Sequence, residues 1–410
     1  MEFFGHTEKA TFLERPNRFT LICQLNGKAV KAFLPNPGRL WELLLPGAEV
    51  YLERALQRMD RMPYTAVAIR KGDHPVMVHT HRTNDLVEHL IKENLIPGLE
   101  GAEIAKREAR YGRSRFDFLL SRGNAEIFLE VKSCTLFGKG VAMFPDAVTA
   151  RGKRHVEELA DLSRNGRAGA VLFLICWPRA RFFLPEYHTD LEFSRALLAA
   201  RKEISILPLA VELGEDLSLT SQARELDIPW DIVEKEAKDR GSYILILKVL
   251  EKMSIQVGRL GPVKFRAGYY LYVGSARANL TQRIERHRRL RKNMFWHVDY
   301  LRAKAEFQYA LPIRTEDPLE CEIARALKEI SDWSIPHFGS SDCSCPSHLF
   351  GMEKDPLRSP EFISLLLHFR MDRMFDSFDY RLGNDPRFLQ RIESARASLR
   401  SGKGILIEDL

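Results

Sequence analysis

Cysteine is scarce in this chain, and long apolar runs are missing. Its six cysteines are spread over 410 residues without a dense pairing pattern, which argues against a disulfide framework and fits a reducing compartment. No uninterrupted apolar run approaches the roughly 18 to 20 residues that a membrane-spanning helix needs. The first residues also lack the charged start and apolar core of a secretory signal. We therefore expect a cytoplasmic protein that does not associate with a membrane.

A strong excess of one charge is missing as well. The formal charge of +7 is small for this length, and it only mildly favours an anionic partner. Hydrophobic residues make up 45% of the chain and charged residues 29%, as in ordinary globular proteins. Because a chain of this length exceeds one ordinary core, we expect two to four domains.

Residues 1–83 consist of short extended runs with few helical stretches. Turns such as Asn26-Gly27 separate the runs, which cover residues 18–24, 28–34, 49–52, 64–70 and 76–78. Regular short strands of this kind predict a small β-barrel, for which an OB-like barrel is one candidate.

Cations and aromatic rings occur together in this predicted barrel. Such a surface suits a nucleic-acid strand, because rings stack on bases while cations follow phosphates. We expect contacts from Arg15, Arg18 and Arg39, the last of which follows a Pro-Gly turn. For Phe19 and Phe33 we favour burial in the barrel core.

Residues 84–230 alternate helical and extended patterns. The predicted order is a helix at 84–97, a hairpin at 113–132, a helix through residue 159, a strand at 168–177, a helix after Pro185 and a strand at 204–211. The run at 168–177 is continuously apolar, as in a buried central strand. This order predicts an α/β sandwich with a central sheet.

The hairpin carries the clearest chemistry in this region. Alternation along its two strands would place Asp117, Glu130 and Lys132 on one face. Two carboxylates that share a hard divalent cation, beside a lysine that orients a water, form a minimal set for metal-assisted phosphodiester hydrolysis. From the pattern alone, the alternative is the solvated face of an ordinary hairpin.

Five stretches of the first 210 or so residues resemble the sugar fermentation stimulation (SfsA) family. They are residues 13–19, 34–40, 111–120, 130–133 and 144–152. The resemblance implies an OB-like barrel, a PD-(D/E)XK nuclease-like domain at 84–230 and a nucleic-acid partner, with DNA favoured over RNA. It also implies that Asp117 and Glu130 hold Mg²⁺ or Mn²⁺, that Lys132 positions the attacking water and that Glu108 adds a further carboxylate.

The helix after the hairpin is basic. Arg151 and His155 are four residues apart and share a face, and on such folds a side chain from this helix can reach the scissile phosphate. Contact with nucleic acid and a solvated basic face both remain open for this pair. We expect Asp146 to cap the same helix.

Composition changes after the α/β region. A charged stretch at 231–240 predicts a linker or connecting helix. Extended runs at 241–247 and 268–274, followed by a strongly basic helix, open a domain that we expect over 241–350. Residues 351–410 are charged and helical in pattern, which predicts a helical tail.

The triplets at 241–243 and 272–274, with the basic helix that follows, resemble the GIY-YIG nuclease superfamily in its Uri-like branch. The resemblance implies an α+β fold with a second site for phosphodiester cleavage. Carried over to this chain, its residues would be Tyr243, Tyr272, Arg283, His287 and the metal ligand Glu322. Glu320 is the alternative metal ligand, because both glutamates begin the same predicted helix. The family's usual Pro-x-x-Asn ending is absent at 336–339, which leaves the ligand choice and the activity of this site open.

Two cysteines and a histidine gather near the end of this domain. Cys343, Cys345 and His348 would need a fourth zinc ligand, for which Cys321 and His337 are candidates. Because Cys-x-Cys lacks the usual two to four intervening residues of zinc fingers, we expect a tight loop that closes the domain and no zinc.

The sequence as a whole predicts a multidomain protein that combines α+β and α/β domains. We expect it to bind nucleic acid and to hydrolyse phosphodiester bonds with a divalent metal, at one site or two. The rival interpretation is a DNA-binding transcriptional regulator of sugar metabolism, whose nuclease-type folds perform no turnover.

Overall fold

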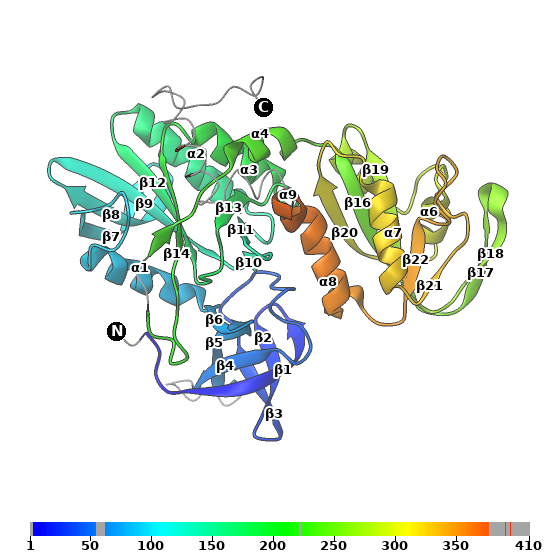
Figure 1. Cartoon of the computed structure of the whole chain (residues 1–410), viewed down its shortest axis with the longest axis horizontal. Coiled ribbons are helices and arrows are strands. Elements are labelled where there is room, and N and C mark those ends of the chain that lie inside the picture. Colours follow the sequence, from blue (N-terminus) through cyan, green and yellow to red (C-terminus); the bar gives the residue numbers. More distant parts are fainter. Residues whose placement is uncertain (1–2, 55–61, 221–222, 377–389, 391–393, 395–410) are drawn as a thin grey trace, which may run out of the picture.

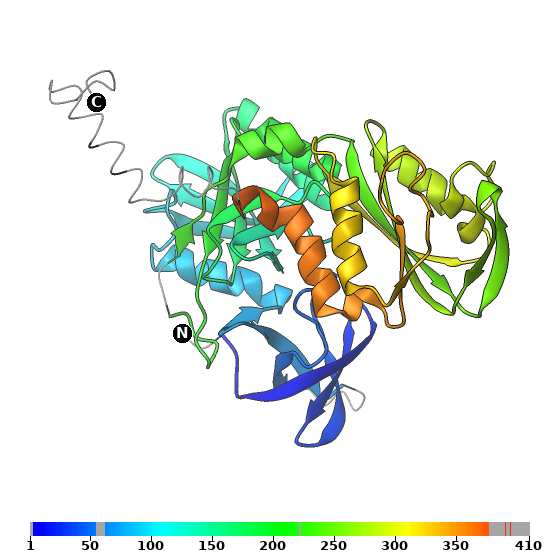
Figure 2. The same ribbon diagram turned by 45° about the vertical axis from the view of Figure 1, so that its right-hand side comes forward.

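The computed structural model describes residues 3–54, 62–220, 223–376, 390 and 394. The chain forms an N-terminal barrel, an α/β part and a C-terminal sheet with its own helices (Figure 1). Helices α8 (Pro360–Leu367) and α9 (Arg373–Asp376) lie between the front half of the chain and the C-terminal sheet (Figures 1 and 2). Within the described ranges no helix is both long and apolar enough to cross a membrane.

The N-terminal part is a closed, OB-like barrel of five strands with a sixth strand beside them. The sheet order is β3-β2-β1-β4-β5-β6, and pairing of Ala32 with Tyr64 between β3 and β5 closes the barrel. The predicted turn Asn26-Gly27 joins β2 to β3 with positive φ at both residues, as a two-residue hairpin requires. The strands are β1 Thr7–Asn17, β2 Thr20–Leu25, β3 Lys28–Phe33, β4 Glu49–Arg54, β5 Tyr64–Lys71 and β6 His74–Met77.

The α/β part is a six-stranded sheet, in the order β15-β14-β12-β9-β8-β7, covered on both faces. Strand β12 is parallel to its neighbours β9 and β14, and its continuous apolar run is buried. Helix α1 packs on one face, while α2 and α3 pack together on the other. The helices are α1 Thr83–Lys92, α2 Ala150–Arg164, α3 Leu191–Ala200 and α4 Trp230–Glu236. The strands are β7 Glu103–Tyr111, β8 Ser114–Arg122, β9 Ala125–Cys134, β12 Ala168–Ile175, β14 Ser205–Ala210 and β15 Arg224–Glu225, with a small sheet of β10 Leu136–Phe137, β11 Val141–Phe144 and β13 Phe182–Pro185.

The C-terminal part is an antiparallel sheet in the order β20-β16-β19-β22-β21. Helices α7 and α8 cover one face, and α5, α6 and the β17-β18 hairpin cover the other. The helices are α5 Leu280–Arg288, α6 His297–Arg302 and α7 Glu320–Ile330. The strands are β16 Gly241–Val249, β17 Met253–Val257, β18 Gly261–Phe265, β19 Gly268–Ala276, β20 Glu306–Arg314, β21 Trp333–Ser334 and β22 Leu349–Met352.

The structure differs from the predicted boundaries in two places. Of the two alternatives for residues 231–240, the helix is observed over most of the stretch as α4, and it is packed instead of free, because Val233 lies in a core with residues of the α/β part. Strand β22 crosses the expected boundary between domain and tail, because it pairs with β19 inside the sheet. After α8, the π-helix His368–Asp372 docks onto this sheet, with Arg370 Nε donating to the carbonyl oxygen of Pro312 at 3.0 Å. Residues 377–389, 391–393 and 395–410 of the expected tail lie outside the described residues.

Asp146 joins the barrel to the α/β part. Its Oδ2 accepts a hydrogen bond from the backbone N of Leu40 at 3.3 Å, and a Cβ on Gly38 would lie 2.4 Å from the same oxygen. The close approach therefore requires glycine at position 38. The prediction that Asp146 caps α2 is wrong, because the Thr149 side chain performs that role by accepting from the backbone N of Gly152 at 3.0 Å.

Candidate metal and nucleic-acid site

Asp117 lies where the pairing between β8 and β9 ends. Its Oδ2 accepts a hydrogen bond from the backbone N of Val131 at 2.8 Å, so the carboxylate continues the contact between the two strands. Its Oδ1 accepts from Asn84 Nδ2 of helix α1, also at 2.8 Å. Burial raises the pKa of Asp117, and the negative charge of Glu130 raises it further. The two carboxylates are therefore electrostatically coupled.

Glu130 is buried at the centre of this site, with 4% of its surface exposed. Lys132 Nζ donates to its Oε1, and His155 Nδ1 lies 2.6 Å from the same oxygen. Burial alone would raise the pKa of Glu130, but the contacts with His155 and Lys132 outweigh burial and lower it. The carboxylate is thus charged at neutral pH, while its buried Oε2 has no hydrogen-bond partner among the described residues.

The structure places His155 beneath the site. It is only 1% exposed, so both alternatives, contact with nucleic acid and a solvated basic face, are wrong for this residue. Arg151 Nε donates to His155 Nε2 at 3.3 Å, and His155 Nδ1 is therefore the nitrogen that donates to Glu130. His155 positions the glutamate, whereas Arg151 is exposed and lines the cavity described below.

Glu108 does not join this group of carboxylates. Its side chain is half exposed and forms an ion pair with Arg115, Oε2 to Nε, at 2.6 Å. It is absent from the lining of the cavity into which Asp117 and Glu130 face. The expected third carboxylate is thus engaged elsewhere on the hairpin surface.

A cavity of about 1170 Å³ connects the carboxylates with the barrel. Asp117, Glu130 and Lys132 all line it, with Arg151 from α2. Arginines from the barrel and from the C-terminal part complete the positive lining, namely Arg15, Arg18, Arg39 and Arg358. The cavity therefore combines a hard-oxygen site with several groups that can bind phosphate.

The three predicted barrel arginines all line this cavity, but they differ in how far the protein itself already binds their guanidinium groups. Arg15 is held by the protein itself, because its guanidinium donates to the carbonyl oxygens of Arg18, Asn36 and Arg39. Arg18 is exposed, and Arg39 lies over the ring of Trp41 at 4.8 Å. Arg18 and Arg39 are thus better placed than Arg15 to meet a ligand.

Phe19 is not in the barrel core. It is 45% exposed because it occupies the turn between β1 and β2, where its backbone N donates to Asn17 Oδ1 at 3.0 Å. Phe33 is partly buried, and the two ring centroids lie 6.4 Å apart. The expected burial of this pair is therefore wrong for Phe19, and the rings offer a surface on which a base can stack.

The predicted tyrosines and histidine of the C-terminal part meet within the sheet core. Tyr243 of β16 places its hydroxyl 2.9 Å from His287 Nε2 of α5, and the Tyr272 ring centroid of β19 lies 6.4 Å from that of Tyr243. Burial raises the pKa of both tyrosines, so both phenols are neutral at pH 7. Arg283 is less buried, and its guanidinium lies 4.4 Å from the ring of Trp296.

Asp299 supports this second group from α6. Its carboxylate lies 3.4 Å from His287 Nδ1 and 2.9 Å from Lys292 Nζ. Burial would raise the pKa of Asp299, but its contacts with His287 and Lys292 outweigh burial and lower the pKa. Burial also lowers the pKa of His287, which leaves the ring neutral and able to accept a hydrogen bond from the Tyr243 hydroxyl.

The two glutamates that begin α7 point in different directions. Glu322 is exposed, whereas Glu320 accepts a hydrogen bond from Ser275 Oγ and lies 3.2 Å from His348 Nδ1. The negative charge of Glu320 also raises the pKa of Tyr272, after the larger effect of burial and that of Tyr243. The structure therefore brings Glu320 to the tyrosines and leaves Glu322 apart from them.

Sequence reasoning missed several residues of the two groups. Asn84 begins the predicted helix at 84–97, and nothing nearby in the sequence indicates that its amide holds Asp117. Asp299 is an isolated acid after a strongly basic stretch, and that isolation is the signal that it neutralises buried cations. Tyr309 and Arg358 line the cavity from the C-terminal part, and no local pattern connects them to a site more than 170 residues earlier in the sequence.

The fold and these sites define a class of protein in which a closed barrel adjoins an α/β domain with coupled carboxylates at a shared cavity. Residues 13–78 match the family described as "SfsA N-terminal OB domain", and residues 81–216 match "Sugar fermentation stimulation protein RE domain". The chain belongs to the SfsA family. Residues 242–369, the Uri-type region, match "Domain of unknown function DUF123".

Curated relatives support this assignment for the front half of the chain. The sugar fermentation stimulation protein homolog of Methanothermobacter thermautotrophicus is 39% identical over 225 residues, which cover 54% of this chain and 93% of that protein. The homolog of Moorella thermoacetica is 42% identical over 194 residues, covering 47% and 84%. The solved structure of Pyrococcus furiosus SfsA in complex with Ca²⁺ is similar at a TM-score of 0.51 and 29% identity, covering 56% of this chain and 99% of that one.

Proposed function

We propose that the chain binds DNA in the cavity between the barrel and the α/β part and hydrolyses its backbone with a divalent metal held by Asp117 and Glu130. The observation that carries this proposal is Glu130 Oε2, a buried carboxylate oxygen without a partner among the described residues. A charged oxygen removed from water is costly unless a donor or cation completes it. Glu130 itself lines a cavity that is also lined by arginines.

The donor set suits Mg²⁺ or Mn²⁺. Hard cations prefer carboxylate oxygens, and Mg²⁺ is usually held by one or two carboxylates together with water and substrate phosphate. The metal would neutralise charge on the phosphate under attack. The similar Pyrococcus furiosus structure was solved with Ca²⁺, a cation that also takes oxygen ligands, and this supports the choice of a hard metal.

The residues around the metal would orient it and the water. Asn84 and His155 fix the two carboxylates, as partners of metal ligands do in other sites. Lys132 lies beside Glu130 and lines the cavity, where its ammonium group would hold the attacking water. The domain resembles the PD-(D/E)XK nucleases in this arrangement of residues.

The C-terminal part would supply a second centre of the GIY-YIG type. Arg283 would bind the phosphate, and Tyr243, whose hydroxyl lies 2.9 Å from His287 Nε2, would take part in proton transfer. Glu320 replaces Glu322 as the candidate metal ligand, because it is the glutamate that lies near the tyrosines. Since Tyr243 and Tyr272 are buried, this centre would need a local opening to admit a backbone.

A second candidate function is DNA binding without turnover. The ion pair between Lys132 and Glu130 favours it, because that pair already neutralises the glutamate inside the protein. Such a protein would act as a regulator of sugar metabolism through the same cavity. Affinity measurements do not separate the two functions, because both need phosphate contacts.

A metal-by-substrate cleavage panel tests the proposal. The substrates are supercoiled, linear and single-stranded DNA, with RNA for comparison. Each substrate is incubated with Mg²⁺, Mn²⁺ or Ca²⁺. The proteins are wild type, Lys132→Ala, Arg283→Ala and the double variant. We expect cleavage by wild type and, if both centres work, its loss only in the double variant. Undiminished cleavage by the double variant overturns the assignment, and binding without nicking under every condition decides for the regulator.

Arg151→Ala is expected to weaken DNA binding without regard to sequence. Each phosphate contact releases condensed counterions, so its loss should reduce the slope of log K against log salt by about 1. Arg154→Ala is the matched control, because Arg154 is exposed on the same helix but does not line the cavity. Fluorescence anisotropy over a salt series measures both slopes, and equal slopes for the two variants would contradict a phosphate contact at Arg151.

A further inference from the structure

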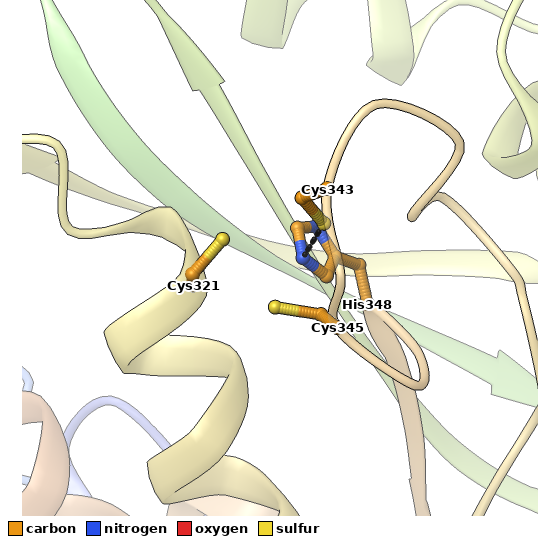
Figure 3. Close-up of side chains that lie close together, drawn as sticks. All are labelled: Cys321, Cys343, Cys345 and His348. Atoms are coloured by element: carbon orange, nitrogen blue, oxygen red, sulfur yellow. Dashed lines mark hydrogen bonds between the residues drawn. The ribbon is translucent and has the colours of Figure 1, made fainter.

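The C-terminal part gathers four metal-ligating side chains that belong to neither site described above and lie next to Glu320 of the second centre. Cys321 lies in the first turn of α7, and Cys343, Cys345 and His348 lie in or next to the loop that leads into β22. Their ligand atoms all lie within 4.8 Å of one another. In Figure 3 the sulfur of Cys321 on the helix and that of Cys345 on the loop point toward one another.

We propose that Cys321, Cys343, Cys345 and His348 bind a structural zinc ion. This inference is independent of the proposed nuclease activity and differs from our sequence prediction of a metal-free loop. That prediction rests on the unusual Cys-x-Cys spacing and leaves the fourth ligand open between Cys321 and His337. Folding supplies the fourth ligand from a helix 22 residues earlier, so the short Cys-x-Cys spacing is sufficient.

The geometry is close to that of a tetrahedral zinc site. Zinc binds sulfur at about 2.3 Å and histidine nitrogen at about 2.0 Å, so the edges of its tetrahedron measure about 3.5 to 3.8 Å. Cys343 Sγ and His348 Nε2 are already 3.4 Å apart, and the widest separation in the cluster exceeds an ideal edge by only about 1 Å. Three thiolates and an imidazole select zinc over the hard cations expected at Asp117 and Glu130.

Glu320 orients the histidine ligand. Its Oε1 lies 3.2 Å from His348 Nδ1, so Nδ1 carries the proton and the lone pair of Nε2 faces the three sulfurs. A carboxylate behind a ligating histidine is the usual support of a zinc site. Ser275 Oγ in turn donates to Glu320, which connects the cluster to strand β19.

The bound ion would join α7 to the sheet. His348 directly precedes β22, and its carbonyl oxygen accepts from the backbone N of Val273 at 2.9 Å. Binding replaces three S–H bonds by Zn–S bonds, and the three protons pass to solvent. Because all four positions are taken by protein, no site is left for substrate water, and the ion would stabilise structure only.

Metal analysis of the full chain tests this proposal. Protein isolated without oxygen, loaded with ZnSO₄ and passed over a chelating resin should retain about one zinc per chain more than the ligand variant His348→Asn. Loading with Co²⁺ should give the near-ultraviolet charge-transfer band of thiolate ligation and the visible bands of a tetrahedral ion.

His348→Asn removes Nε2 but leaves an amide that can still donate to Glu320, and we expect it to lose most of the bound zinc. His337→Asn is the matched control, because His337 is exposed nearby and outside the cluster. Equal zinc retention by the two variants would overturn the proposal.

Alkylation of the wild-type protein keeps the test informative if His348→Asn fails to fold. Zinc should slow the reaction of Cys321, Cys343 and Cys345 with iodoacetamide at least about tenfold, as mapped by peptide mass spectrometry. No protection of these three thiols, a Cys343-Cys345 disulfide in the anaerobic protein, or an iron-sulfur absorption spectrum in place of zinc would each refute a zinc site.

Discussion

Glu130→Gln should reduce metal-dependent cleavage at the first centre by on the order of 10² to 10³-fold. The substitution preserves the shape of the side chain but removes the charge that would hold the cation. Because the second centre would mask the loss, the change belongs in an Arg283→Ala background. Initial rates with Mg²⁺ and Mn²⁺ measure the effect, and calorimetric titration with Mn²⁺ should show weakened binding in the absence of DNA.

Glu126→Gln in the same background is the control for this prediction. Glu126 lies on the same strand, is exposed and does not line the cavity, so its loss should change neither rate nor metal affinity. If Glu130→Gln weakens Mn²⁺ binding but no variant ever cleaves, the metal site stands and the nuclease activity does not. Full activity in Glu130→Gln would remove this glutamate from the mechanism.

The sequence was sufficient for the centre of this site because its parts are local. Asp117, Glu130 and Lys132 lie on adjacent strands joined by a short turn, and two-residue periodicity alone predicts which side chains approach one another. Most strands of the barrel, and the order of helices and strands in the α/β part, follow from the same kind of periodic pattern. The contact of Asn84 with Asp117 depends on how distant elements pack, which no local pattern specifies.

The helical periodicity of α2 also predicts that His155 is buried. The buried side of α2 contains Gly152, His155, Val156 and Leu159, at helical spacing of three and four residues. His155 lies within this apolar stripe, and its basic neighbours Lys153 and Arg154 obscured that position. A polar residue in an apolar stripe is a sign of a buried partner, which here is Glu130.

A second large effect concerns the joint between the front half and the C-terminal part, where His188 is 1% exposed. Its Nδ1 accepts from the backbone N of Arg314 at 2.8 Å, so its Nε2 donates to the carbonyl oxygen of Arg370 at 2.7 Å. This pair of bonds requires the neutral ring. Burial, with the positive charge of Arg370 and more weakly of Arg314 and Arg373, holds the pKa of His188 well below its usual value.

Stability at this joint should therefore fall as the solution becomes acidic. The unfolded chain takes up a proton at His188 near pH 6.5, whereas the folded chain resists it, so the contribution is complete above that pH and is lost below it. The loss approaches about 1.4 kcal/mol per pH unit, or about 2 kcal/mol between pH 6.5 and pH 5. His188→Gln retains an acceptor and a donor but cannot be protonated, and its stability should depend less steeply on pH.

Hydrogen exchange of the Arg314 amide measures this difference directly, because that N–H donates to His188. Comparing wild type with His188→Gln at each pH cancels the intrinsic pH dependence of exchange, and urea midpoints over the same range report the global effect. His6→Gln replaces an exposed histidine and should follow the wild-type curve. A ring that stays neutral in the folded chain must cost stability once the unfolded chain binds the proton. If stability falls with pH equally in wild type and His188→Gln down to pH 5, protonation of His188 does not control the joint.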